Sequence, residues 1–274
     1  MKAIFNFREI NPTEPHLLVN NRAFCYGDGL FETIVTGPER IDLVQSHYDR
    51  LIRGADALNL ELPQDLNIEY IKKSINSFAE ANDINGNIRT KLIIWRKTGG
   101  LYSPENNEAE FYLECKSSNK PLYSRSVEIG VSQKYFNNYS SYSFAKKTNA
   151  LQYVLAGHEM KEMGWNEVIL LDNNDNLSET HIGNLVWMEG DEFFTPEIHT
   201  GCIEGVMRKA IIEAGKTANI TIHEVSKSKK ALDNASSILS INSSGLTSFK
   251  KYSGRSLTDP KPFLEPILKQ LLLP

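Results

Sequence analysis

Two short segments, about thirty residues apart, contain side chains that are suited to chemistry together. The first holds the adjacent lysines Lys146 and Lys147, which precede an amphipathic stretch. The second holds Glu179, which is followed five residues later by Asn184 and then by the apolar run Leu185-Val186-Trp187. A lysine amine forms an imine with a carbonyl compound and then moves protons, and a carboxylate stabilises a nearby positive charge. Each segment alone is weak evidence, but the pair is suited to imine chemistry.

In this order and spacing, the two segments resemble the lysine and glutamate segments of the class IV aminotransferase family. That family includes branched-chain and D-amino acid aminotransferases and aminodeoxychorismate lyase, and its cofactor is pyridoxal 5'-phosphate (PLP). The resemblance implies that one lysine carries PLP as a Schiff base and that Glu179 keeps the pyridine nitrogen protonated. Lys146 is the preferred catalytic lysine, because Asn149 follows it by three residues as in the family, and Lys147 is the alternative.

A segment further along the chain resembles the family's phosphate-binding turn. Gly205, Val206 and Met207 match a glycine turn that leads into a helix, whose first amide groups point at the phosphate. The family often has threonine at the Met207 position, so a side-chain hydroxyl contact is missing here. A glycine before a helix is also a common N-cap, so this match gains weight only from the other segments.

Three more residues complete the cofactor site that the resemblance implies. Arg50, in the stretch His47-Tyr48-Asp49-Arg50-Leu51, matches an arginine that reaches the phosphate, a task that suits its planar guanidinium. Ser243 matches a small hydroxyl residue placed against the same phosphate, and Ser244 is the alternative. Asn184 belongs to the segment of Glu179, although it has the plainer interpretation of a turn residue that satisfies backbone groups.

Two residues are predicted to contact the substrate. Phe31 lies in Tyr26-Gly27-Asp28-Gly29-Leu30-Phe31-Glu32, the most specific match to the family near the N-terminus, whose glycines permit close approach of the backbone to the active site. Arg96 resembles a family arginine at the end of a strand that binds a substrate carboxylate.

The resemblance leaves two reactions open. An aminotransferase moves an amino group between an amino acid, possibly a branched-chain one, and a 2-oxo acid. An aminodeoxychorismate lyase forms 4-aminobenzoate and pyruvate in the folate pathway. Branched-chain enzymes typically have Gly-x-Arg where this chain has Thr33-Ile34-Val35, and the glycine-rich loop after Arg96 is more typical of the lyase. The aminotransferase comes first because it is the commoner activity. A non-catalytic binding protein on the same fold is the third reading, against which the intact Lys146 and Glu179 speak.

Composition excludes several other classes of function. The chain has 274 residues and a formal net charge of −4, which gives no electrostatic case for binding nucleic acid or an anionic membrane. No apolar run approaches the ~18 residues of a membrane span, and no signal peptide follows Met1, so we expect a cytoplasmic protein. The three cysteines and six histidines show no metal-ligand spacing.

Hydrophobic periodicity predicts strands and helices mixed in both halves of the chain, and therefore an α+β fold. We expect two domains, residues 1–118 and residues 119–274, the second carrying the Schiff-base lysine, as in fold-type IV enzymes such as D-amino acid aminotransferase. The polar segment Lys116–Pro121 is the predicted linker. The predicted elements are strands at Lys2–Phe7, His16–Leu18, Gly29–Val35, Ile88–Arg96, Glu108–Cys115, Val127–Val131, Glu167–Leu171 and Leu185–Met188, and helices at Ser46–Leu58, Leu66–Ala81, Asn149–Met163, Gly205–Gly215 and Pro262–Leu273.

The resemblance also implies a homodimer, because a loop of the second subunit closes the active site in that family. Tyrosines gather in the predicted polar loop Tyr135–Tyr142 and at Tyr102. Exposed tyrosines suit an interface, where the ring packs and the hydroxyl stays hydrated. The plainer interpretation is a loop that packs over the chain's own core.

Overall fold

The computed structural model describes residues 3–13 and 19–272, and it divides the chain into two compact units. Unit 1 comprises Met1–Asn119 and Ala145–Ala150, and unit 2 comprises Lys120–Phe144 and Leu151–Pro274. The predicted boundary after residue 118 lies one residue from the first break. The segment around Lys146, however, groups with unit 1, whereas the prediction assigned it to the C-terminal domain.

The sheet of unit 1 is fully antiparallel, with the strand order β2-β1-β5-β4-β3. Its long strands pair closely, since Gly29–Thr36 of β3 lies opposite residues 88–95 of β4. Alternation of side chains along these strands separates a buried face from a half-exposed face. The strands are β1 (Ala3–Phe5), β2 (Arg8–Ile10), β3 (Gly29–Thr36), β4 (Asn87–Arg96) and β5 (Ala109–Ser118).

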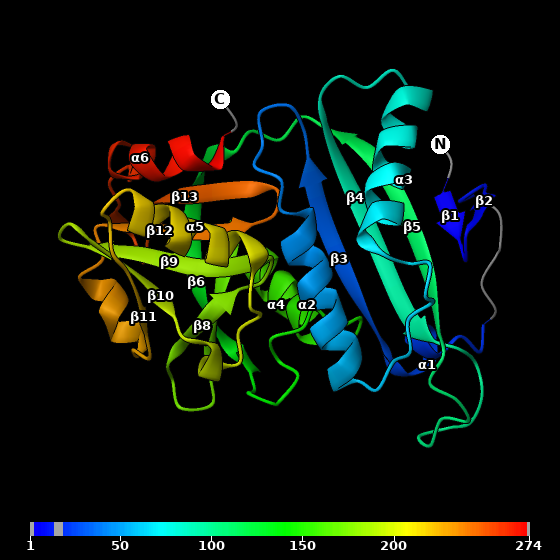
Figure 1. Cartoon of the computed structure of the whole chain (residues 1–274). Coiled ribbons are helices and arrows are strands. Elements are labelled where there is room, and N and C mark those ends of the chain that lie inside the picture. Colours follow the sequence, from blue (N-terminus) through cyan, green and yellow to red (C-terminus); the bar gives the residue numbers. More distant parts are fainter. Residues whose placement is uncertain (1–2, 14–18, 273–274) are drawn as a thin grey trace. The chain divides into compact units, whose positions relative to one another are not determined.

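Two helices pack on the buried face of this sheet (Figure 1): α2 (Val44–Ala57) against β3 and α3 (Ile68–Ala81) against β4. Their apolar stripes meet the buried side chains of the strands, as the periodicity predicted. A short helix, α1 (Arg22–Tyr26), precedes β3. The core consists of Leu30, Ile34, Leu51, Ala55, Ile71, Ile75, Leu92, Ile94, Phe111 and Leu113.

The segment around Lys146 belongs to unit 1 because it pairs with the edge strand β3. The amide of Phe31 donates to the carbonyl of Lys146 at 2.8 Å, and the amide of Thr148 donates to the carbonyl of Gly29 at 2.9 Å. These bonds satisfy backbone groups that the outermost strand of a sheet otherwise exposes. Hydrogen bonding to a sheet edge is invisible to local periodicity, and for this reason the predicted division grouped the segment with the helix that follows it.

Unit 2 contains a nine-stranded sheet in which six strands form a closed ring. The order β9-β12-β13-β6-β7-β8 returns to its start because β8 also pairs with β9. Closure leaves these strands without an unpaired edge along the ring. The strands of unit 2 are β6 (Tyr123–Asn137), β7 (Glu167–Asp172), β8 (Leu177–Thr180), β9 (Gly183–Glu189), β10 (Glu192–Pro196), β11 (Ile222–Val225), β12 (Ser237–Asn242), β13 (Gly245–Tyr252) and β14 (Arg255–Ser256).

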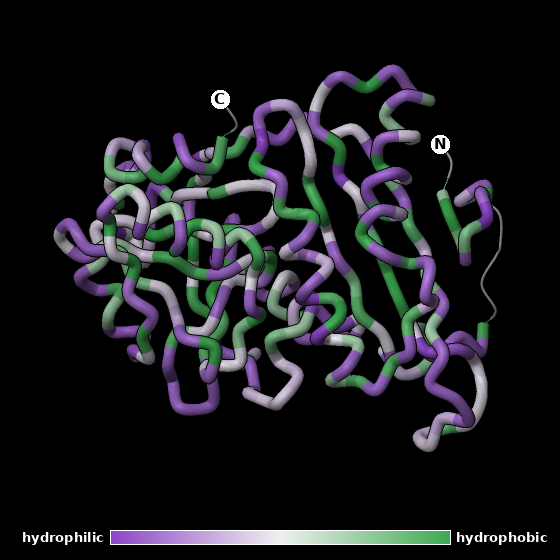
Figure 2. The backbone as a smooth tube through the Cα atoms, viewed as in Figure 1, coloured by the Kyte–Doolittle hydropathy of each residue, from purple (hydrophilic) through white to green (hydrophobic). Residues whose placement is uncertain are grey.

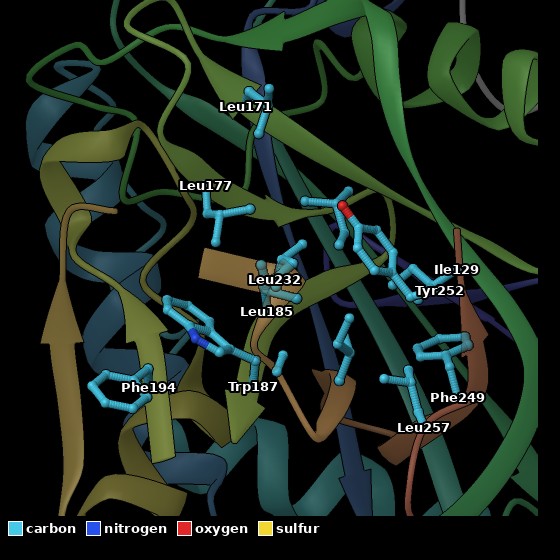
Figure 3. Packing of buried hydrophobic residues seen from close by; sticks show 13 residues of the cluster. Ile129, Leu171, Leu177, Leu185, Trp187, Phe194, Leu232, Phe249, Tyr252 and Leu257 are labelled. Atoms are coloured by element: carbon cyan, nitrogen blue, oxygen red, sulfur yellow. The ribbon is translucent and has the colours of Figure 1, made fainter. Parts of the chain in front are cut away.

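The core of unit 2 lies among these strands (Figure 3). The rings of Trp187 and Phe194 stack at 5.6 Å between centroids, and Leu185, Leu232 and Phe249 are fully buried around them. Hydrophobic stretches follow the strands of each unit, and hydrophilic stretches dominate the connecting loops (Figure 2). The helices of unit 2 are α4 (Leu151–Glu162), α5 (Val206–Thr217) and α6 (Lys261–Leu271), with 3-10 turns η1 (Ile198–Thr200) and η2 (Lys229–Asp233).

The predicted α+β, two-domain fold-type IV architecture is confirmed, and most of the strongly periodic elements lie within two residues of their predicted bounds. Gly164 ends the helix before β7 with φ 74°, as a glycine cap does. The predicted loop at Tyr135–Tyr142 is wrong at its start, because Tyr135–Asn137 continue β6 beyond a bulge and Asn137 pairs with Asp172. The predicted linker likewise begins inside β5. The predicted strand His16–Leu18 lies outside the described residues.

Candidate active site

The structure separates the two candidate lysines by the side of the chain on which each lies. Lys147 pairs with Leu30, whose side chain is in the core of unit 1. Lys146 is on the other side, with its Nζ 4.6 Å from the centroid of the Phe31 ring. Within unit 1, therefore, Lys146 shares its surroundings with the residue predicted to contact the substrate.

The Tyr-Gly-Asp-Gly motif holds the lysine segment through its backbone. Gly27 ends α1 in the left-handed region (φ 65°), and a Cβ there would lie 2.8 Å from the Cβ of Asn149. A Cβ on Gly29 would lie 2.4 Å from the carbonyl oxygen of Ile94. Side chains at these glycines would push either the lysine segment or β4 away.

The Glu179 carboxylate is the best-defined group in unit 2. It is 2% exposed, and it accepts hydrogen bonds from three neutral donors. Asn137 Nδ2 and the Tyr153 hydroxyl donate to Oε1 at 2.9 and 2.7 Å, and the Ile203 amide donates to Oε2 at 3.2 Å. Hydrogen bonds to an ionised carboxylate favour the ionised form. Glu179 is thus held as an oriented anion.

Two neighbours of Glu179 stay neutral at physiological pH. Burial and then the Glu179 carboxylate raise the pKa of Tyr153 well above its usual range, so its hydroxyl remains a donor. The same two causes, in the same order, raise the pKa of the Cys202 thiol to about 12. The negative charge of this cluster therefore stays on Glu179.

Strand register aligns the predicted cofactor residues of unit 2. Glu179 on β8 lies opposite Asn184 on β9, and Asn184 lies opposite Ile241 on β12. The next residue of β12, Asn242, opens the Ser243–Ser244 turn and donates from Nδ2 to the carbonyl of Ile182 at 3.2 Å. One row across the sheet thus brings the glutamate, the asparagine and the serine turn together.

Asn184 and Gly205 fit one another closely. Asn184 Nδ2 donates to the carbonyl of Ile203 at 2.7 Å, and a Cβ on Gly205 would lie 1.8 Å from Asn184 Oδ1. Gly205 is the N-cap of α5 and has no side chain to cap the amides of Val206 and Met207. First-turn amides of a helix lack intrahelical acceptors and favour an anion. Asn184 thus fixes the segment that runs from the Glu179 contact into α5.

The arginine of the glycine-turn segment has a structural role. Arg208 is 4% exposed, and its Nη2 donates to the Pro196 carbonyl and to Glu224 Oε2, both at 2.7 Å. Its Nε donates to Thr195 Oγ1 at 3.3 Å. These bonds tie α5 to β10 and β11, and so hold the N-terminus of the helix in position.

Arg50 lies in a buried cluster on α2 and β3. Its Nε and Nη2 donate to the two carboxylate oxygens of Glu32 at 2.8 and 2.5 Å, and His47 Nδ1 contacts the same carboxylate at 2.7 Å. Burial alone would raise the pKa of Glu32, but the Arg50 guanidinium and the His47 hydrogen bond outweigh it and lower this pKa to about 2. The predicted phosphate contact of Arg50 stays a prediction.

The contacts of Arg96 argue against its predicted role as a carboxylate ligand. Its Nε and Nη2 donate to Asp28, Nη2 also donates to the carbonyl of Leu58, and Nη1 donates to Asn59 and Asn107. These acceptors occupy all five N–H groups of the guanidinium. Arg96 is therefore a positioning residue for the Gly-Asp-Gly motif.

Sequence reasoning missed the residues that hold Glu179. Asn137 is fully buried at the end of β6, and Gln152 Nε2 donates to its Oδ1 at 2.5 Å, which orients its amide toward Glu179. Glu159, on the same helix as Tyr153, accepts from the Ser132 hydroxyl at 2.5 Å and from the Gln133 amide at the β6 bulge. The clue in the sequence was the pair of polar residues Gln152-Tyr153 early in an otherwise apolar helix.

Two other searches of the described part of the chain bear on the site. No cluster of three or more histidine, cysteine, aspartate or glutamate side chains there is arranged to hold a metal ion. Among the same residues, no helix has the length and apolar character needed to cross a membrane.

Comparison with known proteins gives a match along most of the chain. The family model for amino-transferase class IV matches residues 29–252. An aminodeoxychorismate lyase of Vibrio harveyi is 26% identical over 205 residues, which are 73% of each chain. A D-alanine aminotransferase of Staphylococcus aureus (strain N315) is 24% identical over 278 residues, covering 98% of this chain and 95% of the relative.

The fold also matches solved structures. The PLP-bound form of a hypothetical aminotransferase from Mycobacterium tuberculosis superposes with a TM-score of 0.83 at 16% sequence identity. The match covers 99% of this chain and 99% of that one.

We predict that Glu32→Gln destabilises the protein because it breaks the buried ion pair with Arg50. The Glu32 pKa falls from 4.5 to about 2 on folding, which corresponds to roughly 3 kcal/mol of stability at pH 7. A lowered carboxyl pKa stabilises above the unfolded value, and this contribution is lost as the pH falls from 4.5 toward 2. Urea unfolding should therefore show a large deficit at pH 7 that shrinks at pH 3. The exposed Glu39→Gln is the control; equal stability of Glu32→Gln and wild type at pH 7 would contradict the prediction.

We also predict that Tyr153→Phe lowers the free energy of unfolding by roughly 1.5–3 kcal/mol, because it removes a hydrogen bond to a buried carboxylate. Tyr139→Phe is the matched control, since that side chain is 54% exposed. Urea unfolding at pH 7 is the measurement. A Tyr153→Phe variant as stable as Tyr139→Phe would show that the Tyr153 hydroxyl does not support Glu179.

Proposed function

The chain belongs to the class IV aminotransferase family, and on that premise we propose that it is a PLP-dependent enzyme acting on the amino group of a small molecule. We place transamination between an amino acid and a 2-oxo acid first. The observation that carries the proposal is the buried Glu179 carboxylate, which three neutral donors orient beside the segment that begins α5. A structural glutamate does not need so complete a set of neutral donors, whereas a partner for a cationic ring nitrogen does.

The residues of unit 2 fit PLP at both ends of the molecule. Glu179 would face the ring nitrogen, and the amides of Val206 and Met207, which follow Gly205, would bind the phosphate. Asn184 would hold the chain between these two groups, and a hydroxyl of the Ser243–Ser244 turn would add a phosphate contact. Bound PLP supplies an electrophilic carbon and a ring that accepts electrons from the substrate.

The residues of unit 1 would supply the covalent attachment and the proton transfer. Lys146 would hold the cofactor through its Nζ and, once released, carry a proton to and from the substrate carbon. The Phe31 ring beside Nζ limits the access of water and offers an apolar surface to the substrate. Arg50 would add positive charge for the phosphate while it remains paired with Glu32. Assembly as a homodimer and a cytoplasmic location stay predictions.

We predict that Lys146 is the lysine that binds the cofactor. The protein incubated with PLP should absorb near ~400–430 nm, as a lysine-bound cofactor does. Reduction with borohydride followed by peptide mass analysis should then place the pyridoxyl group on Lys146. A label on Lys147 would contradict the assignment, and a protein that stays colourless with PLP would favour a non-catalytic binding protein.

Elimination of pyruvate is the second candidate reaction, and one observation favours it. The Vibrio harveyi relative, which matches 73% of this chain, is an aminodeoxychorismate lyase. Both reactions start with the same covalent chemistry at the lysine and differ in the bond that breaks next.

One panel of substrates separates the two reactions. We expect amino acids with a 2-oxo acid acceptor to give a new amino acid, with no 4-aminobenzoate from aminodeoxychorismate. Release of 4-aminobenzoate and pyruvate in equal amounts, without amino transfer, would replace the first candidate by the second. Lys146→Ala is the control for both assays, because it removes the amine on which either reaction depends.

A further inference from the structure

Lys91 on β4 is a half-buried lysine with an unusual environment. Among the described residues, its ammonium makes no hydrogen bond or ion pair, and its neighbour is the Phe31 ring, whose centroid is 5.9 Å away. Lysine is rarely buried without an anionic partner, because removing an ammonium from water is costly. This environment distinguishes Lys91 from the lysines at the surface that form ion pairs.

The strand register puts Lys91 on the same side of the sheet as Lys146. Thr33 lies opposite Lys91 and Phe31 lies opposite Ile93, so these four side chains share the face of the sheet away from α2. The Lys146 Nζ lies 4.6 Å from the same Phe31 centroid. Both nitrogens are therefore anchored to one ring, and they lie within about 10.5 Å of one another, which is the two distances end to end.

The carboxylate nearest to Lys91 in the sheet serves other groups. Glu114 lies directly opposite Lys91 on β5. Its two oxygens accept instead from the Tyr112 hydroxyl at 3.0 Å and from Lys116 Nζ at 3.1 Å. Arg96, further along β4, uses every N–H on protein acceptors. Within the described part of the chain, Lys91 is thus a cation near Phe31 whose donors the protein itself does not use.

We propose that Lys91 binds a carboxylate of the substrate. The inference rests on the proposed function, since it takes Lys146 as the residue that holds the cofactor. A small amino acid is long enough to reach from the carbon that reacts at Lys146 to a carboxylate at Lys91. An ammonium with three donors stabilises such a group by charge-assisted hydrogen bonds. The substrate class is accordingly an amino acid whose carboxylate, on the reacting carbon or at the far end of the molecule, meets Lys91.

The test measures the binding of two carboxylate probes to the PLP-loaded protein by isothermal titration calorimetry. Glutarate carries two carboxylates and valerate carries one. We expect Lys91→Met to weaken glutarate binding by about tenfold, and Lys91→Arg to restore most of it because the charge returns. Arg89→Met is the matched control, since Arg89 is on the same face one cross-strand pair further from Phe31, opposite Val35.

The pattern across the probes identifies which carboxylate is bound. Equal weakening for valerate and glutarate in Lys91→Met indicates a carboxylate that both share, and weakening for glutarate alone indicates the one at the far end. The proposal is overturned if Lys91→Met binds glutarate as wild type does, if Arg89→Met weakens it equally, or if wild type binds neither probe. Borohydride labelling of Lys146 in the same samples separates this outcome from failure of the proposed function, which would show as an unlabelled lysine.

Discussion

The buried carboxylate of Glu179 is the interaction on which the candidate site depends. An ionised carboxylate is costly to bury, so the protein must surround it with donors and keep it charged. Asn137 from β6, Tyr153 from α4 and the amide of Ile203 before α5 do so from three separate elements. Closure of the strand ring through the pairing of β8 with β9 then fixes Glu179 opposite Asn184. The active-site residues of unit 2 are arranged outward from this anion.

Unit 1 positions its reactive residue by a different means. Lys146 is carried on a short segment whose backbone extends the edge of β3, and the position of this segment depends on glycines that admit close backbone contacts. Asp28 accepts from Arg22 Nε at 2.8 Å and from Arg96 Nε at 3.0 Å, which locks the turn that leads into β3. Two buried arginines thus stabilise the turn, and the lysine segment pairs with the strand that follows it.

Much of this arrangement could be predicted from local sequence, and the remainder could not for identifiable reasons. The helices α2 and α3 and the strand β4 follow from periodicity, because each presents one apolar face to a core. The ring of strands in unit 2 and the pairing of residues 146–148 with β3 depend on contacts between distant segments. Asn137 escaped notice because a bulge in β6 carries the strand into a stretch that reads as polar loop. The site residues show the same division. Motif spacing identified Glu179 and Asn184, and the structure places them in adjacent strands, directly opposite one another. Lys91 belongs to no motif that we recognised, and only the strand register shows that it lies on the same side as Phe31.

The central claim is that Glu179 holds a positive charge on the ring nitrogen of the cofactor, and nitrogen-15 NMR of protein loaded with ring-labelled PLP tests it most directly. The account predicts the chemical shift of a protonated pyridine nitrogen in wild type and that of a neutral nitrogen in Glu179→Gln, which keeps the size of the side chain but removes its charge. Equal shifts in the two proteins, with cofactor bound to both, would contradict the account.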